Sequence, residues 1–325
     1  MRSIDHRFIE TNGIRMHIAE QGRGHLVILC HGFPECWYAW RHQISAIAEA
    51  GFHVVAPDLR GYGQSDRPES VEVYNILELT SDIVGLVHAL GREQAIIVGH
   101  DQGAPLAWHC ALLRPDMFNA IALLSVPYRA RTWDSRPPTE ILNQIAGDRQ
   151  LYVLYFQEPG LAEAELEADV RKSLRMILYS ASGDAPPEKR WRFLFNKSET
   201  FLDSVAEPEQ LPSWLSEQDL DFLTQEFERT GFRGGLARYR NLDRDWQLTS
   251  FLSGAKLAQP ALFIGGEFDT ATTMNREIIN RLEITMPNLK KQVLLPNTGH
   301  WVQQERPTEV NQLLIEFLTQ VTSLD

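Results

Sequence analysis

The sequence predicts an α/β protein built on a mostly parallel sheet of eight strands, with a helical segment inserted into it. Three observations support this prediction. Short apolar, β-branched runs alternate with helical patterns over the first 126 residues, which is typical of parallel strands joined by helices. The alternation stops between residues 129 and 252 and then returns. A strand, a tight turn and a helix also follow one another closely over residues 94–113.

The first two strands form a predicted hairpin, because polar and apolar side chains alternate on both sides of Thr11-Asn12-Gly13. The next run, residues 26–30, is apolar throughout, as expected for a parallel strand that is covered on both faces. In this part of the chain the predicted strands cover residues 6–10, 14–20, 26–30, 53–56, 94–98 and 120–126, and the predicted helices cover residues 40–50, 76–90 and 104–113.

Residues 129–252 are rich in aromatic and charged side chains and contain no convincing buried strand. Prolines divide this segment into short helices. Strands over residues 261–265 and 292–295 and a helix over residues 307–321 then complete the sheet. The expected division is a core of residues 1–128 and 253–325 and a helical cap of residues 129–252, which contributes one wall of the active site.

The composition describes a globular protein, with 43% hydrophobic and 23% charged residues. The formal net charge of -12 argues against nucleic acid and anionic membranes as partners. We see no secretory signal and no apolar run of membrane-spanning length. The three cysteines, Cys30, Cys36 and Cys110, lack metal-binding spacing, and their odd number fits a reducing compartment. We therefore expect a cytoplasmic protein whose cysteines are buried apolar side chains.

An aspartate occupies the centre of Gly99-His100-Asp101-Gln102-Gly103, between a predicted strand and helix. This spacing is that of the nucleophile elbow of α/β-hydrolases, where a serine is usual. A hydroxyl attacks acyl carbon, whereas a carboxylate suits displacement at sp³ carbon and forms an alkyl ester. Asp101 therefore indicates an enzyme that opens epoxides or displaces halide. The alternative is an ordinary turn residue or helix cap.

An elbow nucleophile needs a base, and the base needs an orienting acid, which follow in the order nucleophile, acid, base. Asp269 comes shortly after the strand over residues 261–265, and His300 follows the last strand. Because the carboxyl ends of parallel strands share one edge, we expect Asp101, Asp269 and His300 to converge. Glu267 and Asp245 compete for the role of the acid, and a lone histidine is more often structural.

The segment His31-Gly32-Phe33-Pro34 lies where this fold places part of its oxyanion hole. We expect the backbone amides of Phe33 and Gln102 to donate hydrogen bonds there. We expect Pro34 to fix the conformation of the loop, and a cis peptide bond before Pro34 is one conformation that would do this. The alternative is an ordinary Gly-Pro turn. The neighbouring aromatic residues Trp37, Tyr38 and Trp40 fit pocket lining and core equally well.

Along nearly its whole length the chain resembles the α/β-hydrolase-fold epoxide hydrolases. The motifs that carry this resemblance are His31-Gly32-Phe33-Pro34-Glu35, Asp58-Leu59-Arg60-Gly61-Tyr62-Gly63, Gly99-His100-Asp101, Gly299-His300-Trp301 and the segments around Tyr152 and Tyr239. The resemblance implies that Tyr152 and Tyr239 face the nucleophile from the cap, with Tyr155 as the alternative to Tyr152. Without the resemblance, both tyrosines would be interpreted as packing residues.

The resemblance also implies a reaction. Asp101 would attack the epoxide while the tyrosines protonate its oxygen, and His300 with Asp269 would activate the water that releases a vicinal diol. It implies no metal or organic cofactor, and a small apolar epoxide and water as the reactants. Monomer and homodimer both remain open. We expect the substrate pocket to be lined by His31, Pro34, Trp37, Phe156 and Trp301.

One position departs from the family, because many relatives carry a tryptophan where this chain has Gln102. Haloalkane dehalogenases use the indole N–H of that tryptophan to hold halide, so its absence weakens the dehalogenase alternative. A haloacid dehalogenase on the same Asp-His-Asp machinery is part of this alternative. Fluoroacetate-type dehalogenases tolerate other residues at this position, but they resemble this cap less. A non-catalytic receptor is a third hypothesis; a binding pocket would have no need of a base.

Overall fold

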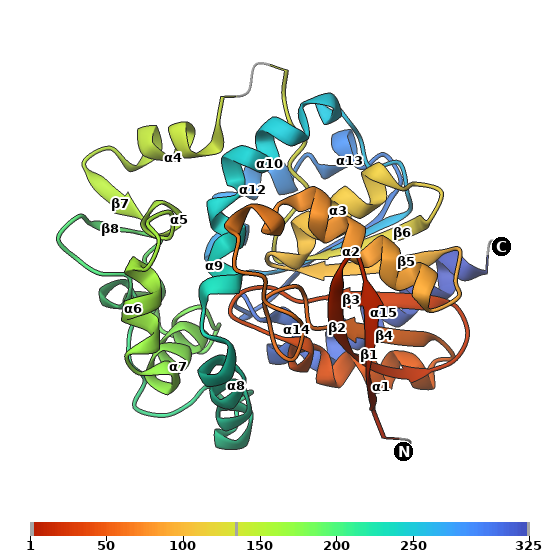
Figure 1. Ribbon diagram of the computed structural model, residues 1–325, viewed down its shortest axis with the longest axis horizontal. Coiled ribbons are helices and arrows are strands. Elements are labelled where there is room, and N and C mark those ends of the chain that lie inside the picture. The colour runs from red at the N-terminus through yellow and green to blue at the C-terminus, as the bar shows by residue number, and fades with distance from the viewer. Residues whose placement is uncertain (1–2, 134–135, 324–325) are drawn as a thin grey trace.

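The computed structural model describes residues 3–133 and 136–323, and its main element is an eight-stranded sheet (Figure 1). Strand β2 is antiparallel to both of its neighbours, β1 and β4, and all other neighbouring strands are parallel, which confirms the predicted fold class. In spatial order the strands are β1 (Asp5–Thr11), β2 (Ile14–Gly22), β4 (His53–Pro57), β3 (Leu26–Cys30), β5 (Ala95–His100), β6 (Phe118–Leu124), β9 (Ala261–Gly266) and β10 (Leu289–Leu295).

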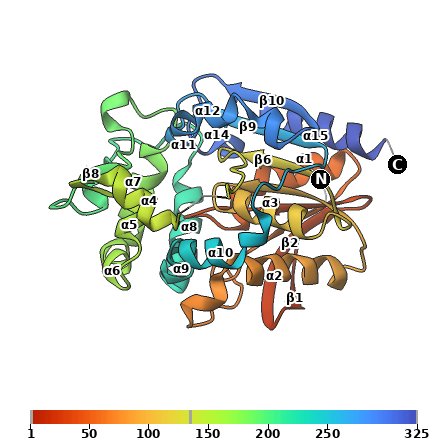
Figure 2. The same ribbon diagram turned by 90° about the horizontal axis from the view of Figure 1, so that it is seen from above.

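Helices cover both faces of this sheet. Helix α1 (Arg41–Glu49) packs against α15 (Pro307–Thr322), and α2 (Ile76–Ala89) packs against α3 (Gly103–Leu113). Figure 2 shows α15 and α2 on opposite sides of the strands. The central strands β3 and β5 are therefore buried along their whole length, which explains their uninterrupted apolar sequences.

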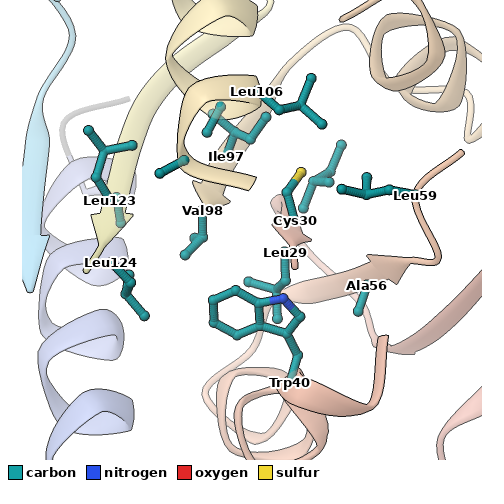
Figure 3. Packing of buried hydrophobic residues seen from close by; sticks show 14 of the residues in the cluster. Leu29, Cys30, Trp40, Ala56, Leu59, Ile97, Val98, Leu106, Leu123 and Leu124 are labelled. Atoms are coloured by element: carbon teal, nitrogen blue, oxygen red, sulfur yellow. The ribbon is translucent and has the colours of Figure 1, made fainter. Parts of the chain in front are cut away.

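The core lies between these layers (Figure 3). Leu29, Val98 and Leu124 come from three neighbouring strands, and Trp40 packs in the same cluster; all four are 0% exposed. Cys30, Cys36 and Cys110 are free and buried, as expected. This packing holds the carboxyl ends of β3, β5 and β6 in fixed relative positions.

The chain between β6 and β9 forms a layer of helices, most of which lie beyond one end of the sheet, whereas α10 (Leu242–Leu248) packs against α2 (Figure 1). Its other helices are α4 (Pro138–Ala146), α5 (Tyr152–Tyr155), α6 (Leu161–Glu167), α7 (Val170–Ser180), α8 (Glu217–Thr230) and α9 (Arg233–Arg240). Contrary to expectation, it also contains a two-stranded antiparallel sheet of β7 (Arg149–Leu151) and β8 (Leu194–Asn196). Strands of three residues are too short to produce a recognisable alternation.

Two sides of this helical layer are hydrogen-bonded to the sheet domain. On one side, the Asp245 carboxylate accepts from the Ile76 N–H at 2.6 Å, and Arg233 donates to the Glu69 carbonyl at 2.7 Å. On the other side, the Trp301 indole donates to the Leu178 carbonyl at 2.9 Å. Among residues 3–133 and 136–323, none of the helices is both long and apolar enough to cross a membrane.

A buried ion pair joins the loop after β4 to helix α2. The Arg60 guanidinium contacts both carboxylate oxygens of Asp82, at 2.5 and 2.8 Å, and the two side chains are 5% and 2% exposed. The Asn12 side chain donates to the same carboxylate from the first hairpin at 2.9 Å. Three segments that are distant in sequence therefore meet at Asp82.

We expect Arg60→Leu to lower the free energy of unfolding by about 3–5 kcal/mol, because it leaves the buried Asp82 carboxylate without its counter-charge. Urea denaturation at neutral pH measures this change. The double variant Arg60→Leu/Asp82→Leu should lose much less, and Arg136→Leu, which breaks an exposed pair with Glu140, should change little. Equal losses in Arg60→Leu and Arg136→Leu would contradict this account.

Candidate active site

Asp101 lies in a strained turn at the carboxyl end of β5, next to the start of α3. Its φ of 48° is in the left-handed region, which is unusual for a residue other than glycine. The flanking glycines are required sterically, because a Cβ on Gly99 would lie 2.2 Å from the Gly103 carbonyl oxygen and one on Gly103 would lie 2.2 Å from the Cys30 carbonyl oxygen. The strand, turn and helix thus form the elbow geometry that the motif predicts.

The structure brings Asp101, His300 and Asp269 together in one line. His300 Nε2 lies 3.4 Å from Asp101 Oδ2, and His300 Nδ1 lies 3.2 Å from Asp269 Oδ1. Asp269 is 1% exposed and also accepts hydrogen bonds from the Ala271 N–H and the Thr272 hydroxyl. Asp101 follows strand β5, Asp269 follows β9 and His300 follows β10. The carboxyl ends of these three strands share one edge of the sheet.

The two competitors of Asp269 lie elsewhere. Glu267 is exposed and accepts a long hydrogen bond of 3.4 Å from the Asn297 N–H. Asp245 lies on α10, where it accepts from Ile76. Only Asp269, of these three carboxylates, is hydrogen-bonded to His300.

The surroundings of Asp101 and His300 shift the pKa values of these two side chains. Burial would raise the pKa of Asp101, but the hydrogen bond and charge of His300, with help from His100 and the Phe33 N–H, hold it below the usual value. Burial would lower the pKa of His300, but Asp269 and Asp101 together raise it well above the usual value. Each of the two groups therefore favours the charged form of the other.

The two oxygens of Asp101 have different surroundings. The Phe33 N–H donates to Oδ1 at 2.8 Å, whereas Oδ2 faces His300. The Phe33-Pro34 peptide bond is cis, and a Cβ on Gly32 would lie 2.4 Å from the Asp101 Cβ, so the loop approaches the elbow closely. Gln102 precedes α3 directly, which puts its backbone beside Asp101.

Tyr152 and Tyr239 lie next to each other, with ring centroids 6.0 Å apart, and the Tyr239 ring packs edge-on against Phe33 at 5.6 Å. Burial raises the pKa of both phenols, and the negative charge of Asp101 raises the pKa of both further. Tyr155 instead donates to Glu165 at 2.9 Å. Of the two candidates on α5, Tyr152 is therefore the one that lies beside Tyr239.

The residues expected to line the pocket are all buried. His31, Phe156 and Trp301 are 0% exposed. His31 accepts from the Leu59 N–H at 3.1 Å and thereby supports the loop rather than facing open space. Pro34 is buried, and Trp37 packs against His6 and Phe222.

The sequence reasoning missed a buried pair beneath the triad, Glu35 and His100. His100 Nε2 donates to the His300 carbonyl at 2.8 Å, and its Nδ1 lies 2.8 Å from Glu35. Burial would raise the pKa of Glu35, but His100 and the Gly32 N–H hold it below the usual value. Both residues stand within motifs noted in the sequence, but only the pairing of β3 with β5 brings them together.

Comparisons with known proteins agree with this geometry. A family model described as alpha/beta hydrolase fold matches residues 25–307. The chain is 45% identical to epoxide hydrolase A of Mycobacterium tuberculosis, over 96% of this chain and 97% of that protein. It is 39% identical to an epoxide hydrolase of Caballeronia sordidicola, over 97% of this chain and 94% of that protein.

Among solved structures, an epoxide hydrolase from an endophytic Streptomyces matches with a TM-score of 0.96 and 45% identity, over 99% of this chain and 97% of that one. An epoxide hydrolase A from Mycobacterium thermoresistibile matches with a TM-score of 0.92 and 46% identity, over 98% of each chain. Identity at this level along the whole length, on the same fold, shows that this chain belongs to the epoxide hydrolases of the α/β-hydrolase fold.

Proposed function

We propose that this protein converts small apolar epoxides into vicinal diols through a covalent ester on Asp101. The observation that carries the proposal is the setting of Asp101. A carboxylate stands at the elbow, with one oxygen on the Phe33 N–H and the other free to attack beside His300. Two phenols, Tyr152 and Tyr239, lie within its field.

In the first half-reaction, Asp101 Oδ2 attacks a ring carbon, and the bond between that carbon and the epoxide oxygen breaks. The leaving alkoxide is basic and needs a proton. Because the pKa values of Tyr152 and Tyr239 are raised, both phenols remain protonated at neutral pH and can donate hydrogen bonds to the oxygen. One of them then transfers its proton, so the product of this step is a hydroxyalkyl ester and a tyrosinate.

In the second half-reaction, His300 removes a proton from water, and the resulting hydroxide attacks the carboxyl carbon of Asp101. Negative charge develops on Oδ1, where the Phe33 N–H already donates and where we assign the Gln102 N–H as the second donor. The ester bond to Oδ2 breaks, and the alkoxide takes the proton of the new carboxylic acid and leaves as the diol. The proton held by His300 returns to the tyrosinate, and Asp101 is again a carboxylate. Asp269 stabilises the imidazolium while it exists.

The pKa of His300 changes during this cycle. In the free enzyme, both Asp269 and Asp101 raise the pKa of His300. Esterification removes the charge of Asp101, and with it one of the two anionic partners. The pKa of His300 then falls and the imidazolium loses its proton to bulk water, which makes the imidazole available as a base when the ester is ready for hydrolysis. A proton is taken up again from water when Asp101 is released as a carboxylate.

The proposal assigns different roles to two parts of the chain. Residues 129–252 act as a cap that supplies both tyrosines, and residues 1–128 and 253–325 form a core that supplies the triad and the oxyanion donors. Halide displacement is the less favoured reaction, because Gln102 stands where haloalkane dehalogenases hold halide with an indole N–H.

The first test is diol formation from a panel of racemic aryl and alkyl epoxides. We expect the wild-type protein to form diols and Asp101→Ala to form none, because the variant lacks the nucleophile. Chiral chromatography of the products measures both the diol and the enantiomeric preference. Halide release from haloalkanes, without diol from any epoxide, would instead identify a dehalogenase.

We expect His300→Gln to accumulate the ester on Asp101, because the glutamine cannot activate water while the first half-reaction continues. Intact-mass analysis after mixing with excess epoxide should show the protein heavier by the mass of one substrate. In ¹⁸O-water, the first turnover of the wild-type enzyme should label the enzyme and leave the diol unlabelled. A labelled diol in that turnover would eliminate the covalent route.

The two half-reactions should respond differently to pH. The pKa of Asp101 lies below its usual value, so the alkylation rate should stay level as pH falls from 7 to about 5. Hydrolysis needs neutral His300 and should slow over the same interval, so the ester fraction should rise towards acid pH. Rapid-quench mass analysis measures both rates; parallel decline of the two would contradict the assigned roles.

A further inference from the structure

Glu305 is a buried carboxylate that the proposed reaction does not use. It ends α14 (Val302–Glu305), the single helical turn that follows His300, and it is 8% exposed. Its oxygens accept three backbone hydrogen bonds: from Gly299 at 2.8 Å, from Trp301 at 3.1 Å and from Gly183 at 2.9 Å. The first two donors flank His300 in the chain, and the third comes from the segment that follows α7.

Hydrogen bonds hold three successive peptide units around His300. In the first unit, which joins Thr298 to Gly299, the Gly299 N–H donates to Glu305. The N–H of His300 itself donates to the Ala181 carbonyl at 2.7 Å. In the unit after His300, the N–H donates to Glu305, while the carbonyl accepts from His100 at 2.8 Å and from Ser125 at 2.7 Å. Rotation of any of these planes would turn the Cα–Cβ bond of His300, so the bonds fix where its imidazole points.

The segment at residues 181–183 meets the His300 loop backbone against backbone. A Cβ on Gly299 would lie 2.3 Å from the Gly183 nitrogen, and one on Gly183 would lie 2.6 Å from the Asn297 carbonyl oxygen. Glu305 bridges this contact, because one of its oxygens, Oε2, accepts from both Gly183 and Gly299. The carboxylate therefore joins the helical layer to the loop that carries the base.

A carboxylate suits this position better than an amide. Its two oxygens accept three N–H groups, whereas a glutamine would have one oxygen and an NH₂ group that would oppose one of these donors. Burial and the nearby charge of Asp184 raise the pKa of Glu305 to about 7, although all three N–H groups act in the opposite direction. Above that pH the group is an ionised carboxylate, which accepts all three hydrogen bonds, and rate measurements that depend on it are made at pH 8 or above.

We propose that Glu305 is a positioning residue for His300, which fixes the peptide units on both sides of the base and ties them to residues 181–183. The inference rests on the proposed function. Alkylation by Asp101 does not depend on the orientation of the His300 imidazole, whereas activation of water does. Displacement of a reacting group by about 1 Å can cost 10²-fold in rate, so the hydrolytic step should be the one that depends on Glu305.

The test compares Glu305→Gln with wild type and with Glu316→Gln, a matched change at an exposed carboxylate on α15. Rapid-quench intact-mass measurements with a racemic aryl epoxide that the wild type hydrolyses give the alkylation and hydrolysis rates separately. We expect Glu305→Gln to alkylate within about threefold of wild type and to hydrolyse its ester about 10- to 100-fold more slowly. Both kcat and KM should fall as the ester accumulates, and Glu316→Gln should match wild type.

Glu305→Asp keeps the carboxylate on a shorter side chain and should recover part of the hydrolysis rate. Equal slowing of both steps in Glu305→Gln, or no slowing of hydrolysis, would overturn the inference. If thermal melts show that neither Glu305 variant folds, the residue serves the stability of the fold and the inference is likewise wrong. The wild-type arm separates the two proposals, because a folded wild type that forms neither ester nor diol would overturn the proposed function itself.

Discussion

The backbone conformation of Asp101 is the constraint on which the rest of the site depends. A φ of 48° is unfavourable for an aspartate, and it persists because the turn is enclosed between β5 and α3, with room only for glycine on either side. This turn lifts the carboxylate off the end of the central strand. The loop after β3 then reaches it from one side with the Phe33 N–H, and the loop after β10 reaches it from the other with His300.

Around this turn, buried carboxylates are hydrogen-bonded to backbone N–H groups. Glu35 and Glu305 are both buried, and both accept from backbone N–H groups of active-site loops, at Gly32 in one case and at Gly299 and Trp301 in the other. Buried carboxylates are costly unless they are fully hydrogen-bonded. What the protein gains from them is a set of loops whose peptide planes have little freedom.

Local patterns were sufficient to predict the strands, the hairpin and the elbow. The eight-stranded sheet, the turn at Asn12-Gly13 and the convergence of Asp101, Asp269 and His300 follow from alternation, from turn residues and from the shared edge of parallel strands. The family resemblance was needed to single out Tyr152 and Tyr239, because nothing in their local sequence separates them from packing residues.

The features that were missed depend on contacts between distant segments. Glu35 and His100 are 65 residues apart, and Glu305 and Gly183 are 122 residues apart, so no window of sequence contains either contact. The β7–β8 ribbon was missed for another reason, because a strand of three residues is too short to show an alternation of polar and apolar side chains. His31 and Trp301 illustrate a third limit: a motif does not show which hydrogen bonds a buried side chain makes, here with the Leu59 N–H and the Leu178 carbonyl.

The position of the tyrosines relative to Asp101 is determined by how the helical layer is attached to the sheet domain. Tyr152 and Tyr239 belong to α5 and α9, whereas Asp101 belongs to the sheet, so their separation is set by contacts across the boundary. These contacts lie on two sides: the Asp245 and Arg233 hydrogen bonds on one, and those of Trp301, Ala181 and Gly183 on the other. The second group consists of contacts with the His300 loop itself. The same bonds that hold the helical layer over the sheet therefore also hold the loop that carries His300, so the position of its imidazole and the positions of the two tyrosines depend on shared contacts.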